Sequence, residues 1–265
     1  MKIKIKNENG ANIVVASALY GAQLVLISID FGTITETINS DTINGVDGAI
    51  YYGSTFDARD ITFQFLNKKY NSRQIMAALS PKTEGTLEFD NKYTISGKFI
   101  GTPTLTQPAY NTDYVYSVTF RAFDPYFKAI LGEKTLAFEN SGGSLYENGI
   151  YNYQKLAINN SGDCGCPLRV SLEPTTVNGK RGLFSVADYN GGSPIYEGWT
   201  FKADTAKGTV CIIETDKRNK DAYFDYDKFS AYPMYILPPG NSVLYALNVK
   251  GSLKYNPRYI SIREG

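Results

Sequence analysis

Short runs of alternating apolar and polar residues recur along this 265-residue chain, and they limit its possible folds more than any other feature. Alternation with a period of two places the apolar side chains on one face of an extended strand, so each run predicts a half-buried β-strand. The runs of the first half are KIKIK (2–6), LVLISI (24–29), DITFQF (60–65), TLEF (86–89), YTISGKF (93–99) and YVYSVTFRAF (114–123). We therefore expect a mainly β protein.

One segment of the first half has the period of a helix instead. NSRQIMAAL (71–79) spaces its apolar residues along one helical face, and Asn71 or Ser72 can cap its first amides. Pro81 disfavours helical geometry in the residue before it, so the helix is expected to end there. Such a short helix is stable only when packed, so we expect it to lie on a sheet.

The pattern changes after residue 130. The stretch 131–149 is rich in Gly, Ser, Asn and Glu, which is typical of a linker. Beyond it, short strands separated by turn residues return without a convincing helix, which is typical of a β-sandwich. We predict an N-terminal β-rich module with one short helix (1–130), a linker (131–149) and a C-terminal β-sandwich module (150–265). The strand 114–123 is predicted to be the last of the first module, since the Asp-Pro pair that follows ends it.

Composition argues against several classes of function. Lys and Arg together number 27 and Asp and Glu 26, so no basic surface for tight nucleic-acid binding is indicated. His is absent, which removes the commonest general base and metal ligand. No apolar run is long enough for a membrane span, and the start lacks the apolar core of a signal peptide. We expect no enzyme activity, cofactor or metal, although the scattered carboxylates leave a hydrolase as an alternative.

The Gly-rich segment GVDGAIYYGSTFDAR (45–59) is a candidate contact site in the first module. A segment of this length between strands usually has a function. It is either a mobile loop or a hairpin arm that orders against a neighbouring subunit. Its candidate interface residues are Tyr51, Tyr52, Phe56 and Arg59.

A second aromatic pair lies in the C-terminal module. Tyr196 and Trp199 follow the turn-like stretch NGGSP (190–194), where exposed rings could stack on a sugar. The favoured alternative is that Trp199, the only Trp, packs in the sandwich core. The first interpretation gives the alternative function, a carbohydrate-binding protein that attaches to bacterial cell-wall glycans.

The order of several motifs resembles a known family along nearly the whole chain. In the first module these are GVDG (45–48), STFDARDITFQF (54–65), SRQIMAALSP (72–81), GTLEF (85–89), YTISGKFIG (93–101) and FRAFDPYF (120–127). In the second they are TVCIIETDKR (209–218), YILPPGNSVLYAL (235–247) and LKYNPRYISI (253–262). Together they resemble the distal tail proteins of siphophages, often called Dit.

The resemblance implies a structural role at the end of a phage, or phage-derived, tail. Distal tail proteins form a hexameric ring that joins the tail tube protein to the tail-tip hub protein, next to the tape measure. Their N-terminal module builds the ring, and their C-terminal sandwich is galectin-like or like a carbohydrate-binding module. In some relatives that sandwich holds receptor-binding proteins. The implied location is the distal end of the virion tail after synthesis in the bacterial host cytoplasm, with DNA passing through the ring without specific binding.

Overall fold

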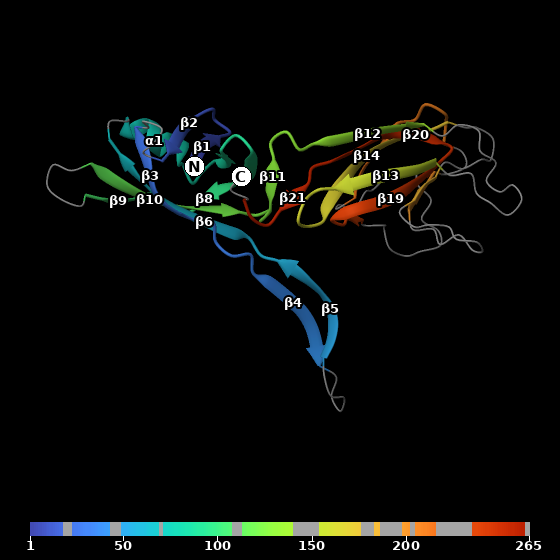
Figure 1. The fold of residues 1–265 in the computed structure, drawn as a ribbon, viewed down its shortest axis with the longest axis horizontal. Helices are drawn as coiled ribbons and strands as arrows, with labels where there is room; N and C mark the ends of the chain where they lie inside the picture. The colour runs from blue at the N-terminus through green and yellow to red at the C-terminus, as the bar shows by residue number, and fades with distance from the viewer. Residues whose placement is uncertain are drawn as a thin grey trace, which may run out of the picture. The chain divides into compact units, whose positions relative to one another are not determined.

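The computed structural model describes residues 1–17, 23–42, 49–68, 71–107, 113–139, 154–175, 183–185, 198–201, 205–215 and 235–262. The chain forms two compact units, one made of Met1–Leu131 with Ile260–Gly265 and the other of Gly132–Tyr259. Strands dominate both units, as Figure 1 shows, so the predicted mainly β fold is confirmed. No helix in these ranges is long and apolar enough to cross a membrane.

The first unit is built on nine strands that pair side by side. They are β1 (Lys2–Asn7), β2 (Asn12–Ala16), β3 (Leu24–Asp30), β6 (Arg59–Asn67), β7 (Glu84–Phe89), β8 (Tyr93–Phe99), β9 (Thr104–Thr106), β10 (Tyr114–Ala122) and β11 (Phe127–Ala129). Within this unit they pair in the order β11-β8-β7-β1-β2-β3-β6-β10-β9. The pair β2–β3 is parallel, and the other pairs in this order are antiparallel.

A further pairing closes the strands from β8 to β10 into a barrel. β10 also pairs with β8, with Phe120 opposite Phe99 and Arg121 opposite Lys98. Gly97 permits this close approach, because a methyl group there would overlap the carbonyl oxygen of Arg121. Closure removes the open edges that β8 and β10 would otherwise present to water or to other chains.

Aromatic side chains fill the barrel. Phe63, Phe65 and Phe120 are fully buried, and the Phe65 ring stacks on Tyr116 with ring centroids 5.2 Å apart. Along the strands these inward aromatic residues alternate with outward polar residues, in agreement with the period-two pattern of the sequence. Burying each such ring stabilises the fold by roughly 1.5–3 kcal/mol, so the interior is the main source of the unit's stability.

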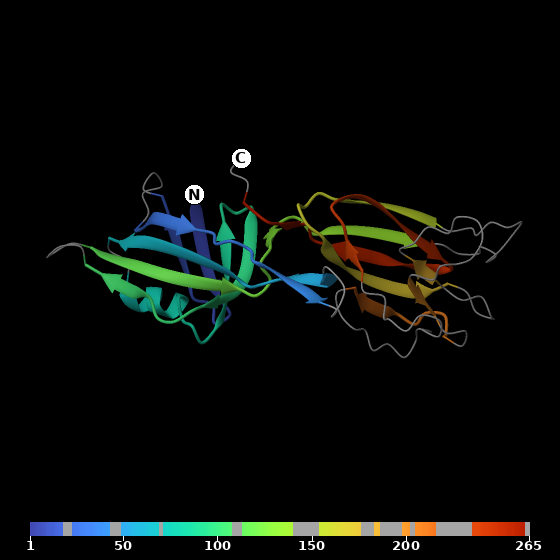
Figure 2. The same ribbon diagram turned by 90° about the horizontal axis from the view of Figure 1, so that it is seen from below.

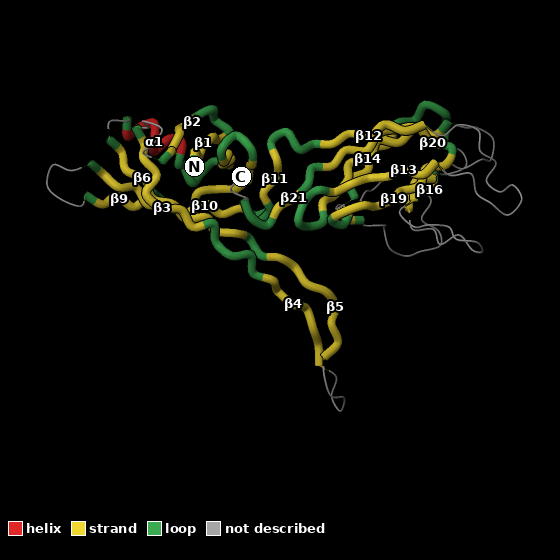
Figure 3. Tube along the Cα trace, in the orientation of Figure 1, coloured by secondary structure: helices red, strands yellow, loops and turns green. Residues whose placement is uncertain are grey.

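The predicted helix is present as α1 (Ser72–Ala78), the one helix in the described residues (Figure 3). Asn71 caps this helix, because its side-chain oxygen accepts a hydrogen bond from the Arg73 amide at 2.9 Å. The helix contacts β1 and β2, and its Ile75 and Ala78 are buried. Figure 2 shows its coiled ribbon beside the strands of the first unit. Packing on the sheet therefore stabilises a helix that is too short to be stable alone.

Two features of the chain around residue 130 differ from the expected pattern. The strand 114–123 is not the last of the first unit, because β11 follows and pairs with β8. Asp124-Pro125 only interrupts the chain between β10 and β11, and Pro125 is buried. The predicted linker 131–149 includes Lys134–Glu139, a strand of the second unit. The division of the chain into modules 1–130, 131–149 and 150–265 stays a prediction.

In the described residues the second unit contains one five-stranded and one four-stranded sheet. Its strands are β12 (Lys134–Glu139), β13 (Gln154–Asn160), β14 (Cys166–Pro174), β15 (Leu183–Ser185), β16 (Gly198–Thr200), β17 (Cys211–Glu214), β18 (Ile236–Leu237), β19 (Gly240–Leu247), β20 (Val249–Tyr255) and β21 (Arg258–Tyr259). One sheet has the order β12-β20-β14-β17 and the other β13-β19-β15-β16, and β18 pairs with β14.

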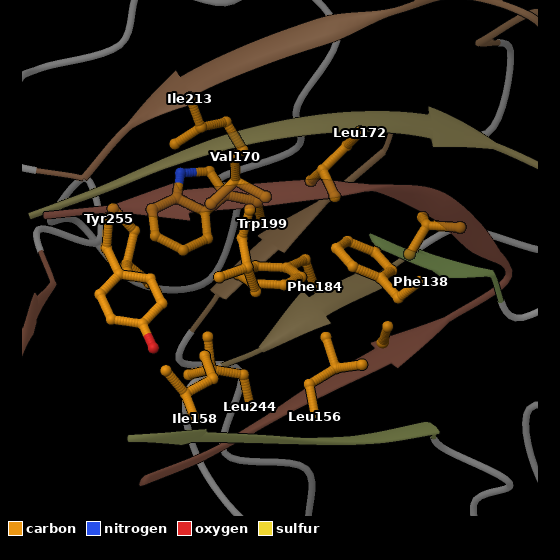
Figure 4. Packing of buried hydrophobic residues seen from close by; sticks show 14 of the residues in the cluster. Phe138, Leu156, Ile158, Val170, Leu172, Phe184, Trp199, Ile213, Leu244 and Tyr255 are labelled. Atoms are coloured by element: carbon orange, nitrogen blue, oxygen red, sulfur yellow. The ribbon is translucent and has the colours of Figure 1, made fainter. Parts of the chain in front are cut away.

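The core of this unit lies between its two sheets, as Figure 4 shows. Val170, Leu172 and Ile213 come from the first sheet, and Phe184 and Trp199 come from the second. Side chains from both sheets meet in one apolar layer, which is the packing of a β-sandwich. The finer prediction of a galectin-like sandwich stays a prediction.

Candidate functional site

A separate two-stranded hairpin belongs to the first unit. β4 (Glu36–Thr42) pairs only with β5 (Ala49–Phe56) in the described residues, from Glu36 opposite Phe56 to Thr42 opposite Ala49. Figure 1 shows this hairpin running away from the barrel strands. Of the predicted loop or arm at 45–59, residues 45–48 lie outside the described part, and most of the rest forms β5. The hairpin alternative is therefore the one seen in the backbone.

The described side chains of the hairpin are exposed, including two large apolar ones. Ile38 is 61% exposed and Phe56 is 49% exposed. Phe56 lies opposite Glu36, and Ile38 is two residues beyond Glu36 on the same strand. Cross-strand partners and residues two apart point to the same side, so Ile38 and Phe56 share one face of the hairpin.

The first strand of the hairpin leaves the barrel through an aromatic cluster. Phe31 packs edge-on against Phe89 and Phe127, with ring centroids 5.5 and 5.8 Å away. Phe89 and Phe127 also pack on each other at 5.7 Å. Edge-to-face rings at these distances attract one another beyond their buried area. The cluster therefore fixes the chain just before the hairpin begins.

The returning strand is fixed by the same part of the chain. Phe56 packs edge-on against Tyr126 with centroids 6.1 Å apart. The Asp57 amide donates to the Thr35 carbonyl at 2.9 Å, and the Thr37 hydroxyl donates to the Asp57 carboxylate at 3.1 Å. Both strands are thus tied together where they meet the barrel.

Arg59 differs from the exposed contact residue that the sequence suggests. It is 2% exposed, because its guanidinium lies over the Phe127 ring, 4.7 Å from the centroid. Its Nη2 donates to the Ile260 carbonyl at 2.6 Å. In this structure Arg59 is therefore buried at the start of β6 (Arg59–Asn67), and its contact with a neighbouring subunit stays a prediction.

An exposed ion pair follows on the outer face of the barrel. Arg121 donates through Nε and Nη2 to the two carboxylate oxygens of Asp60 at 2.8 and 2.7 Å. The hydrogen bond from Arg121, with its charge, holds the pKa of Asp60 below its usual value, and desolvation opposes this. The same bond raises the pKa of Arg121. The pair joins β6 to β10 next to the hairpin base.

The remaining predicted contact residues are divided between the core and the parts not described. Tyr51 and Tyr52 lie in β5, but their side chains are outside the description, as is all of Tyr196. Trp199 is 1% exposed and packs near Phe184 at 6.0 Å (Figure 4). A buried ring offers no face to a sugar, so in this structure Trp199 is the core residue of the favoured interpretation.

Sequence reasoning missed the aromatic residues that hold the hairpin base. Phe31 reads in the sequence as an ordinary strand-flanking residue. Tyr126 and Phe127 are expected to pack the chain where it leaves the strand 114–123, but nothing in the sequence connects them to the hairpin. The available signal was the pair of aromatics directly after Asp124-Pro125, because a turn that ends in two rings must pack them somewhere.

The described residues contain no group of three or more His, Cys, Asp or Glu side chains placed to hold a metal ion. Among the described residues, Cys164, Cys166 and Cys211 form no disulfide, and Cys166 and Cys211 are buried. Burial raises the pKa of the Cys166 thiol to about 11. That thiol is therefore protonated at neutral pH and poorly nucleophilic.

Comparison with known proteins places this fold. The sequence matches no protein-family model and no curated protein sequence. The crystal structure of Dit from phage SPP1, described as a paradigm of the hub adsorption apparatus in Gram-positive infecting phages, is 13% identical with a TM-score of 0.61. The match covers 97% of this chain and 98% of that one.

Two structures of the phage P2 baseplate in its activated conformation, with Ca and with Sr, are also similar. Each is 12% identical with a TM-score of 0.46, over 98% of this chain and 99% of the other. The SPP1 match extends along nearly all of both chains. The resemblance to distal tail proteins is therefore confirmed at the level of the fold, since this chain folds like SPP1 Dit along almost its entire length.

Proposed function

We propose that this protein is a structural component of a phage or phage-derived tail tip and forms a hexameric ring there. The observation that carries the proposal is the fold match to SPP1 Dit over 97% of this chain. The motif order in the sequence supports the same role independently of that match. Because one fold can serve several functions, the exposed residues of the first unit must also be suited to contact between subunits.

The hairpin is the part of the first unit that best suits contact with a second copy. Ile38 and Phe56 expose apolar area on one face, and a two-stranded ribbon is at best marginally stable in water by itself. Among the described residues, β4 and β5 pair with no further strand, so their outer edges are open to pairing with another chain. A neighbouring subunit that covers this face and an edge would stabilise the hairpin and link the two copies.

A head-to-tail contact of this kind generates a closed ring when the rotation between copies closes. The arm of one subunit and the surface that receives it on the next are then different patches. The number of six copies rests on the resemblance to distal tail proteins, which form hexameric rings. In such a ring the first unit builds the ring, and the second unit is available to other tail proteins, including receptor-binding proteins.

The proposed ring joins the tail tube protein on one face to the tail-tip hub protein on the other. DNA passes through its channel without specific binding. The charge balance of +1 supports this part, because each neutralised phosphate would add affinity and slow the passage of DNA. No catalytic role is proposed.

Electron microscopy of the purified full-length protein tests this proposal. We expect negatively stained particles with sixfold rotational averages, and light scattering that gives six times the chain mass. Immobilised tube protein and hub protein should each retain the ring. Particles that remain monomeric at high micromolar concentration and bind neither partner would contradict the proposal.

A further inference from the structure

The buried guanidinium of Arg59 is the least expected feature of the first unit. Arginine is rarely fully buried unless it is paired, and burying a charge is costly without hydrogen bonds. Arg59 is nevertheless 2% exposed, and it opens β6 only three residues after the exposed Phe56. A buried charge at this position needs a structural reason.

The contacts of Arg59 join two segments that are distant in the sequence. Its Nη2 donates to the backbone carbonyl of Ile260 at 2.6 Å, and its guanidinium lies 4.7 Å from the centre of the Phe127 ring. Ile260 belongs to the short C-terminal segment that completes the first unit. A charged donor to a carbonyl and a cation over an aromatic face are both stronger when water is excluded.

Phe127 is also where the two strands of the hairpin converge. Phe31, ahead of β4, packs on Phe127, while Phe56, at the end of β5, packs on the adjacent Tyr126. Arg59 covers the Phe127 ring from the β6 side. Arg59 therefore connects three parts of the first unit, which are the hairpin base, the segment after Asp124-Pro125 and the C-terminal segment.

We propose that Arg59 is a positioning residue that, with Phe127 and the Ile260 carbonyl, fixes the hairpin base and makes the C-terminal segment necessary for subunit association. The association part rests on the proposed ring function. The anchor itself does not, because it concerns the isolated chain. In this proposal Arg59 itself does not contact the neighbouring subunit. It acts by fixing the orientation in which the hairpin meets that subunit.

The test compares Arg59→Met with Arg59→Lys, and with Arg73→Met as the matched control on the exposed helix surface of the same unit. Methionine keeps much of the side-chain length but loses the charge and all donors. Lysine keeps the charge but lacks the planar fork that stacks on a ring. A fourth variant ends the chain after Tyr259, which removes the Ile260 carbonyl and leaves Arg59 intact.

Amide hydrogen exchange of the monomeric variants gives the direct readout. The Asp57 amide, which donates to the Thr35 carbonyl, and the Gly32 amide, which donates to the Asp30 carboxylate, report on the chain just after and just before the hairpin, at its base. We expect Arg59→Met and the truncation to speed exchange at both amides by about tenfold, since a hydrogen bond to a charged group is lost. Amides of β1, β7 and β8 should change by less than about twofold. Arg59→Lys should fall between wild type and Arg59→Met.

Three results would overturn the anchor. One is equal acceleration in the hairpin and the barrel strands, because Arg59 would then support the whole unit. Another is unchanged exchange at both reporter amides. The third is a truncation that matches wild type while Arg59→Met does not, because the Ile260 carbonyl would then be irrelevant. If Arg59→Met does not fold, the truncation decides the question.

Sedimentation of the same variants tests the association part. We expect the Arg59→Met and truncated chains to dissociate at concentrations at least about tenfold higher than wild type, because a loosely held arm loses entropy on docking. If the wild type itself does not associate, the ring function fails while the exchange pattern still decides the anchor. If the wild type associates and the anchor variants associate equally well, the coupling of anchor to assembly is wrong.

Discussion

In the hairpin of the first unit Phe56 is 49% exposed, whereas in the sandwich of the second unit Trp199 is 1% exposed. Both residues lie in Gly-rich aromatic segments that look alike in sequence. Their surroundings differ because β16 joins a sheet whose inner face is covered by a second sheet, while β4 and β5 form a two-stranded sheet of their own. The presence of a second layer, and not the local composition, decides whether an aromatic residue is buried in a core or stays exposed.

Replacing the buried ring gives the largest expected effect. Trp199→Ala should destabilise the second unit by about 3–5 kcal/mol, the usual cost of removing a large core aromatic. Urea unfolding followed by far-UV circular dichroism measures it. Val243→Ala, at a 41% exposed position of the same unit, is the control and should change stability by less than about 0.5 kcal/mol. A Trp199→Ala protein as stable as this control would mean that the ring is not part of the core.

Adding one methyl group in each unit tests whether the two cores are separate. Alanine at Gly97 would overlap the Arg121 carbonyl, and alanine at Gly251 would overlap the Ser171 carbonyl. Each should cost about 1–3 kcal/mol in its own unit, since a backbone atom cannot move aside easily. Fluorescence of Trp199 reports on the second unit, so Gly251→Ala should shift its unfolding midpoint and Gly97→Ala should not. A shift of equal size from both would contradict two separate cores.

The barrel and the sandwich strands could be predicted because their signal is local. Runs such as 60–65 and 93–99 alternate in a way that fits half-buried strands, and α1 carries its own cap at Asn71. Closure of the barrel is not local. It depends on β10 meeting β8, which the sequence marks only by the absence of a side chain at Gly97.

The candidate site was predictable only in part. A Gly-rich aromatic segment indicates a loop or arm, and Phe56 is indeed exposed. Arg59 is a candidate interface residue in the sequence only because it belongs to the segment 45–59. Nothing local reveals its distant partner, the Ile260 carbonyl, 201 residues further along the chain. Long-range pairs of this kind are visible only when the chain is folded.

The exposed ion pair beside the hairpin should give the smallest effect. Asp60 has a lowered pKa in the folded protein, so its contribution is complete above the unfolded value of about 3.9 and is lost as pH falls through the folded value. Because both side chains are well exposed, Asp60→Asn should cost only about 0.2–1 kcal/mol at neutral pH.

Hydrogen exchange of barrel amides at neutral and at strongly acidic pH measures this contribution. The difference between wild type and Asp60→Asn should disappear in acid, whereas the exposed Asp113→Asn control should show little difference at either pH. A difference that grows as pH falls would mean that the pair does not stabilise the folded state.

The central claim is that the exposed face of the hairpin joins copies of this chain. Native mass spectrometry of wild type and of an Ile38→Ser, Phe56→Ser double variant tests it most directly, with Ile212→Ser, Val243→Ser in the second unit as the matched control. We predict a hexamer for wild type and control, and folded monomers for the hairpin variant, with unchanged circular dichroism. A hairpin variant that assembles as well as wild type, or a wild type that stays monomeric, would contradict the account.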